Sequence, residues 1–257
     1  MGKFLRLLRK DLEASKWPVT MLSGVSLIWY LFLRLKLEST WSLSQVMFLL
    51  WFPLMFLPFW LIWESFQTLR TEWREDTAYT LIVLPVPGWY ITLSKLLAMF
   101  VEYSLLLAVN IGGILVIFRT QLPEMFGSLL QELPVSWLIR SMFILYLASL
   151  GIFTYAIVFI QLAFVVSKMV GRLQGLVALW VLALASWFVN RMGILLEPLF
   201  RWVPPVSLDR LFHMERVGVT YDSFLWNLSP QIGIWLAVLA LFILTAWLLE
   251  EYVEINE

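Results

Sequence analysis

The sequence predicts an all-α, polytopic membrane protein with six transmembrane helices. Of its 257 residues, 61% are hydrophobic and only 14% are charged, with a mean hydropathy of +0.84, whereas soluble domains carry roughly 25% charged residues. Six largely uncharged runs are also close to the length of about 20 apolar residues that a bilayer-spanning helix needs. A transmembrane barrel would instead show alternating strands of about ten residues, a pattern that this sequence lacks.

A single transmembrane domain over residues 1–257 accommodates the whole chain. We expect its spans at 17–37, 41–64, 93–118, 137–167, 172–190 and 231–249. The run 77–94 also lacks charge, but Pro85, Pro87 and Gly88 interrupt it, so it is excluded as a span. In the second span, Pro53 and Pro58 each remove a backbone donor and are expected to bend the helix unless neighbours compensate.

Residues 1–16 predict an amphipathic helix that lies in the membrane interface. One face carries Phe4, Leu5, Leu8 and Leu12, and the other carries Lys3, Arg6, Arg9, Lys10 and Glu13. The alternative is an ordinary basic flank that obeys the positive-inside rule, and both descriptions can hold at once. Five basic residues before the first span place the N-terminus in the cytoplasm, and six spans return the C-terminus to that side. The acidic tail 250–257 is expected to be a solvated end.

Several kinds of chemistry are excluded by composition. The chain has no cysteine, so thiolate metal sites and a Cys nucleophile are ruled out. Its single histidine argues against histidine metal sites, though not against every carboxylate site. A net charge of zero gives no field to recruit nucleic acid. The glycine pattern that cradles phosphates before Lys-Ser or Lys-Thr is missing, so ATP hydrolysis by the P-loop route is excluded. His213 with Ser207 is a poor catalytic candidate, because a lone loop histidine is usually a surface residue. We expect no catalytic residue, no metal and no cofactor bound by this chain.

Four residues within the predicted spans are candidates for a substrate pathway. Glu102, Asn110 and Asn190 are polar side chains at positions where polar groups are costly. Trp187 is a deep aromatic side chain that could contact an amphipathic substrate, although helix packing is its default role. Glu102 has an alternative too, because it follows Lys95 by about seven residues and could lie near the cytoplasmic headgroups.

The outer segment 191–230 is long and partly apolar. Leucine and aromatic residues precede Pro204 and Pro205, and further apolar residues follow. We expect short helices that lie in the outer leaflet or re-enter it. Any part that enters the hydrocarbon must be buried in protein or line a wet cavity, because its backbone would otherwise lack hydrogen-bond partners.

The segment 68–92, between the second and third spans, is charged and punctuated by proline. Residues 72–77 are expected to form a short charged helix, 81–84 are apolar, and the prolines turn the chain into the third span. The order of Glu72, Thr77, a leucine-rich stretch, Pro85-Val86 and Lys95 resembles the motif that follows the second span in permease subunits of the type-2 ABC exporter family. Asp76 and Gly88 depart from it, since the family often has Gly at the first position and a polar and then a basic residue near the second.

The resemblance implies a coupling helix at about residues 70–79, which docks in a groove of a separate cytoplasmic ATPase. Its interface would comprise Glu72, Trp73, Arg74, Glu75, Asp76, Thr77 and Tyr79. The alternative is a solvated helix without a partner. The resemblance also implies that the outer segment helps to close the pathway, with Leu199, Trp202, Pro204 and Pro205 as the candidate outer gate.

The membrane fold and this resemblance together imply the permease subunit of an ATP-driven exporter in a bacterial or archaeal cytoplasmic membrane. Two copies, or one copy and a related chain, would form the pathway above two ABC ATPase subunits that bind ATP and Mg. The expected substrate is a peptide, a drug or another amphipathic molecule. The alternatives are the substrate-capturing membrane subunit of an importer and a membrane-embedded enzyme, for which no polar constellation can be assembled.

Overall fold

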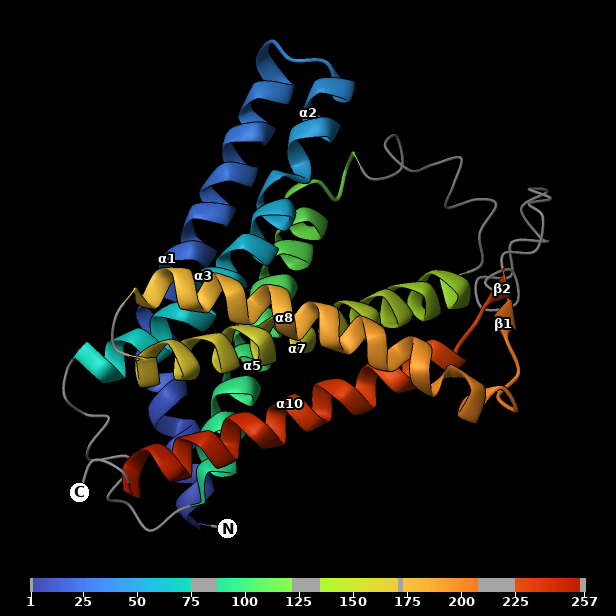
Figure 1. The fold of residues 1–257 in the computed structure, drawn as a ribbon. Helices are drawn as coiled ribbons and strands as arrows, with labels where there is room; N and C mark the ends of the chain where they lie inside the picture. The colour runs from blue at the N-terminus through green and yellow to red at the C-terminus, as the bar shows by residue number, and fades with distance from the viewer. Residues whose placement is uncertain (1, 75–86, 122–134, 171–172, 208–224, 255–257) are drawn as a thin grey trace. The chain divides into compact units, whose positions relative to one another are not determined.

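The computed structural model describes residues 2–74, 87–121, 135–170, 173–207 and 225–254, and Figure 1 shows that helices dominate this part of the chain. The helices are α1 (Gly2–Ser39), α2 (Leu43–Leu50), α3 (Phe52–Arg74), α5 (Gly88–Ile117), α7 (Val135–Val170), α8 (Gln174–Leu196), the 3-10 helix η1 (Glu197–Phe200) and α10 (Ser229–Glu254). Strands β1 (Val206–Ser207) and β2 (Leu225–Trp226) form a two-residue antiparallel pair.

Six helical segments among the described residues are long and apolar enough to cross a membrane. They are Gly2–Ser39, Leu43–Thr71, Gly88–Ile117, Ile139–Val170, Gln174–Phe200 and Ser229–Glu251. The predicted helical fold class and the predicted number of candidate spans are therefore confirmed. Together these helices indicate a multi-pass membrane protein.

The chain packs as two compact units. Unit 1 comprises Met1–Thr68 and Leu93–Glu132, and unit 2 comprises Leu69–Thr92 and Leu133–Glu257. The first unit therefore contains α1, α2, most of α3 and most of α5. The second contains α7, α8 and α10 together with the end of α3 and the first turn of α5.

The buried face of α1 runs along the whole helix. It consists of Leu7, Asp11, Ser15, Val19, Ser26, Tyr30 and Leu33, at spacings of three, four or seven residues that keep side chains on one face. The helix does not break between the predicted interfacial helix 1–16 and the predicted first span. At about 1.5 Å per residue its 38 residues measure about 57 Å, so α1 extends beyond a hydrocarbon core of about 30 Å.

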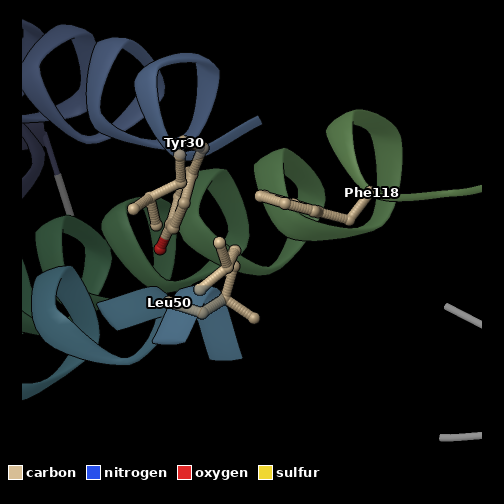
Figure 2. Close-up of a cluster of buried hydrophobic side chains, with 5 residues drawn as sticks. Tyr30, Leu50 and Phe118 are labelled. Carbon is tan, nitrogen blue, oxygen red and sulfur yellow. The ribbon is translucent and has the colours of Figure 1, made fainter. Parts of the chain in front are cut away.

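A cluster of fully buried side chains joins three elements of unit 1 (Figure 2). Tyr30 and Leu33 come from α1, Val46 and Leu50 come from α2, and Phe118 follows the end of α5. Their burial removes apolar surface from contact with solvent and fixes the α1–α2 hairpin against the end of α5.

The predicted bend at Pro53 coincides with a helix break, since α2 ends at Leu50 and α3 begins at Phe52. Proline has no backbone N–H, so Pro53 cannot donate to the carbonyl of Leu49, its partner in a continuous helix. The indole N–H of Trp29 on α1 donates to this carbonyl instead, at 3.1 Å. Pro58, by contrast, lies inside α3 without interrupting it.

Unit 2 is built on α7, α8 and α10, each of which packs against the other two. Glycines permit the closest approach between α8 and α10. A Cβ atom added to Gly193 would meet the Ile234 side chain at 2.8 Å, and one added to Gly233 would meet the Cα of Gly193 at 3.1 Å. Small residues at such crossings are typical of packed membrane helices, because they let two backbones come together.

Two helices continue past boundaries predicted from the sequence. Helix α3 runs without a break to Arg74, the last described residue before residue 87, so Glu72, Trp73 and Arg74 continue this helix. Helix α8 runs past residue 190 to Leu196, so the beginning of the predicted outer segment is helical. The chain therefore enters both connecting segments from a continuous helix.

Candidate functional site

The predicted ATPase-coupling residues lie at the end of α3 and just beyond it. Glu72, Trp73 and Arg74 belong to this helix. The others, Glu75, Asp76, Thr77 and Tyr79, lie outside the described residues. The structure describes α3, which leads into the coupling segment (residues 75–86), and Pro87 and Gly88, which follow the segment.

The residues that follow the coupling segment, Pro87 and Gly88, lie against the end of α10. Helix α5 begins at Gly88, and the N–H of Tyr90 donates to the carbonyl of Pro87 at 2.9 Å. The N–H of Gly88 itself donates to Oε1 of Glu250. The start of α5 and the end of α10 are therefore directly bonded within unit 2.

A buried ion pair links α1 to α5 in unit 1. Asp11 Oδ1 lies 3.6 Å from Lys95 Nζ, and the two side chains expose only 5% and 2% of their surface. The second carboxylate oxygen of Asp11 accepts a hydrogen bond from the Ser94 hydroxyl at 2.8 Å. Asp11 reaches this position because it shares the buried face of α1 with Leu7 and Ser15.

Two further carboxylates, Glu64 on α3 and Glu102 on α5, are buried in the same unit. Glu102 lies within electrostatic reach of Ser15, Glu64 and Asp11. Its two carboxylate oxygens make no hydrogen bond of ordinary geometry within the described part of the chain. Helical side chains tilt toward the N-terminus of their helix, so Glu102 leans toward the end of α5 that carries Lys95.

The resulting cluster contains three carboxyl groups and one ammonium group. Its members are Asp11, Glu64, Lys95 and Glu102, with Ser15 and Ser94 as the hydroxyl groups. Buried charges in proteins are normally paired and hydrogen-bonded, because desolvation is otherwise costly. Within the described residues, Asp11 has an ammonium partner, Lys95, within ion-pair distance.

Asn110, the second candidate pathway residue, connects α5 to α1. Its Oδ1 accepts a hydrogen bond from the Tyr30 hydroxyl at 2.7 Å, and its Nδ2 donates to the Leu106 carbonyl at 2.7 Å. The side chain is completely buried. Glu102 and Asn110 are thus both buried in unit 1, and Asn110 contributes directly to helix packing.

The other two candidate pathway residues belong to α8 in unit 2, and both are exposed. Asn190 donates from Nδ2 to the carbonyl of Ser186 at 2.9 Å. The guanidinium carbon of Arg191 lies 5.8 Å from the centre of the Trp187 ring, a distance typical of a cation–π contact. Lining of a substrate pathway by these four residues stays a prediction.

The candidate outer-gate residues are all exposed. Leu199 lies in η1, and Trp202, Pro204 and Pro205 follow it before β1. This stretch is held to α10 by the Ser229 hydroxyl, which donates to the Phe200 carbonyl at 2.9 Å. The structure therefore anchors the segment at its start, and its action as a gate stays a prediction.

The described residues contain no group of three or more His, Cys, Asp or Glu side chains that could hold a metal ion. Comparison of the chain with protein-family models, curated proteins and solved structures finds no match. The type-2 ABC exporter family, suggested by the resemblance of residues 72–95, therefore stays a prediction.

Sequence analysis missed the cluster around Asp11. Lys95 was identified from the sequence as part of a motif and by its spacing from Glu102, but not as the buried partner of Asp11. One signal was available, because Asp11 and Ser15 follow Leu7 at intervals of four residues and so fall on the same helical face. A carboxylate on an otherwise apolar face indicates a buried partner, but the identity of that partner depends on the tertiary structure.

Proposed function

We propose that this chain is the membrane permease subunit of an ATP-driven ABC exporter. One observation supports it most: α3 runs unbroken from a candidate membrane span into the charged residues Glu72 and Arg74, and α5 begins the next candidate span at Gly88. The charged segment is therefore flanked by two long apolar helices. The motif of type-2 ABC exporter permeases, which follows the second span, requires this order.

A helix that continues out of a membrane span is a stiff connection to a soluble partner. The carboxylates of Glu72 and Glu75 and the guanidinium of Arg74 offer charge-assisted contacts, and Trp73 offers an apolar anchor of the kind enriched in binding hot spots. The partner we propose is a cytoplasmic ABC ATPase, two copies of which bind ATP and Mg. Both termini of the permease would then lie in the cytoplasm.

The exporter would contain two copies of the chain, or one copy and a related permease. ATP binding would draw the ATPases together and displace the coupling segments, which favours one of two states of the pathway. Glu102, Asn110, Trp187 and Asn190 are the proposed lining residues, and Leu199, Trp202, Pro204 and Pro205 are the proposed outer gate. The proposed substrate is a peptide, a drug or another amphipathic molecule.

Association with the ATPase tests this proposal. The affinity-tagged chain is purified from membranes together with its candidate ABC ATPase, and the Glu72→Ala/Trp73→Ala double variant is compared with Arg119→Ala. Arg119 is an exposed residue just beyond the opposite end of α5, so its loss should not matter. We expect the double variant to lose most of the bound ATPase at unchanged membrane abundance. Equal recovery of the ATPase with the wild type, the double variant and Arg119→Ala would contradict the proposal.

A further inference from the structure

The beginning of α5 is capped by a side chain from a helix more than a hundred residues away in the sequence. The Gly88 N–H is one of the first amides of α5, which have no carbonyl partner within the helix. It donates instead to Oε1 of Glu250, near the end of α10. A carboxylate at this position is favoured twice, because the hydrogen bond is charge-assisted and because the N-terminus of a helix carries partial positive charge.

The backbone of Gly88 lies directly on α10. A Cβ atom at this position would overlap with the backbone oxygen of Ala246 and would come within 3.0 Å of Cγ of Glu250. Ala246 and Glu250 are four residues apart, so they form one stripe on the surface of α10. Glycine is therefore the residue that allows the start of α5 to reach this stripe.

A second contact holds the same turn of α5 to α7. Gln161 Nε2 donates to the carbonyl of Thr92 at 3.5 Å, and both residues are almost completely buried. The Thr92 hydroxyl in turn lies 3.4 Å from the carbonyl of Gly88. Residues 88–92 are accordingly grouped with α7, α8 and α10 in unit 2.

We infer that Glu250 is a positioning residue that fastens the end of the coupling segment to the C-terminal helix. The part of this inference that concerns force depends on the proposed function. Pro87 and Gly88 follow the coupling segment in the chain and lead into α5, so a displacement of the segment acts on the first turn of α5. Because Glu250 and Gln161 bond to this turn, the displacement passes to α10 and α7 as well as along α5. The acidic C-terminal end, expected from the sequence to be merely solvated, then has a mechanical role.

Hydrogen–deuterium exchange of the purified full-length chain tests the contact without any ATPase. The informative variant is Glu250→Ala, and the matched control is Glu251→Ala, which removes the same charge one residue further on. We expect amide exchange in peptides covering residues 88–92 to accelerate on the order of tenfold in Glu250→Ala, as the loss of a hydrogen bond to a charged group implies. Glu251→Ala should match the wild type, and equal exchange in all three proteins would overturn the inference.

Transport-linked ATP turnover tests whether the contact passes force. In the assembled complex, Glu250→Ala should keep the ATPase bound but reduce turnover severalfold, whereas Glu251→Ala should not. Unchanged turnover in Glu250→Ala, despite faster exchange and despite a clear loss in the Glu72→Ala/Trp73→Ala variant, would overturn the mechanical role alone. If the Glu72→Ala/Trp73→Ala variant also keeps full ATPase binding and full turnover, the proposed function is contradicted. The contact between Gly88 and Glu250 is still tested separately by the hydrogen–deuterium exchange experiment.

Discussion

The hydroxyl of Tyr30 donates a hydrogen bond to Asn110 Oδ1 at 2.7 Å, although 80 positions separate the two residues in the chain. Both side chains are completely buried. The Asn110 amide also donates to the carbonyl of Leu106, so its acceptor and its donor are both engaged inside unit 1. This pair connects α1 with α5 between two candidate membrane spans, where a polar group without a partner is costly.

Replacing Asn110 by Leu should destabilise the protein, because the Tyr30 hydroxyl loses its acceptor in an apolar setting. Interhelical hydrogen bonds of this kind contribute about 0.6–2 kcal/mol in membrane proteins. The midpoint of thermal unfolding in detergent should therefore fall in Asn110→Leu and stay close to wild type in Asn190→Leu, whose side chain is exposed. Adding Tyr30→Phe to Asn110→Leu should restore part of the lost unfolding midpoint. If the double variant instead loses the sum of the two single-variant decreases, the two side chains do not interact.

Adjacent glycines on α5 should respond differently to the same substitution. A Cβ atom at Gly113 would lie 3.0 Å from Leu27 Cδ2 and 3.0 Å from Tyr30 Cδ2, whereas one at Gly112 would meet nothing within 4 Å. The Tyr30 ring cannot easily yield, because Asn110 holds its hydroxyl. We expect Gly113→Ala to cost about 1–3 kcal/mol and Gly112→Ala to be neutral or slightly stabilising. Equal unfolding midpoints for these two variants would contradict the close approach of α1 and α5.

The buried Asp11–Lys95 ion pair predicts that removing one of its two charges strongly destabilises the protein. Lys95→Met would leave the Asp11 carboxylate buried without its cation, and breaking such a pair typically costs about 3–5 kcal/mol. The variant should show a large drop in unfolding midpoint or in membrane abundance, whereas Lys16→Met, at an exposed position, should show neither. The combination Asp11→Asn/Lys95→Met should recover much of the loss. If Lys95→Met is as stable as the wild type, the pair does not hold α1 to α5.

The composition of the sequence was sufficient to predict the helical class and the six candidate spans, because apolar run length is a local property. It did not predict the continuity of α1 and α3. The boundaries at residues 16 and 64 were placed where polarity changes, but backbone hydrogen bonding continues across both positions. Side-chain polarity sets the surroundings of a helix and does not by itself end it.

The pairing of polar groups was the part that sequence analysis could not supply. Asn110 was identified as a polar residue within a span, but its bond to Tyr30 depends on how α1 and α5 pack. The sequence marked Gly88 as a break in an uncharged run and as a departure from the family motif, and Glu250 as part of an acidic tail. Their contact joins positions that no periodic pattern relates, so it becomes visible only in the fold.

ATP turnover by the candidate ABC ATPase, reconstituted with this chain in lipid vesicles, tests the proposed function most directly. The account predicts that the wild-type chain changes the turnover rate of its ATPase and that Glu72→Ala/Trp73→Ala abolishes this effect, while Arg119→Ala behaves as wild type. A turnover rate that is identical with the wild-type chain, with the double variant and without any permease would contradict the account.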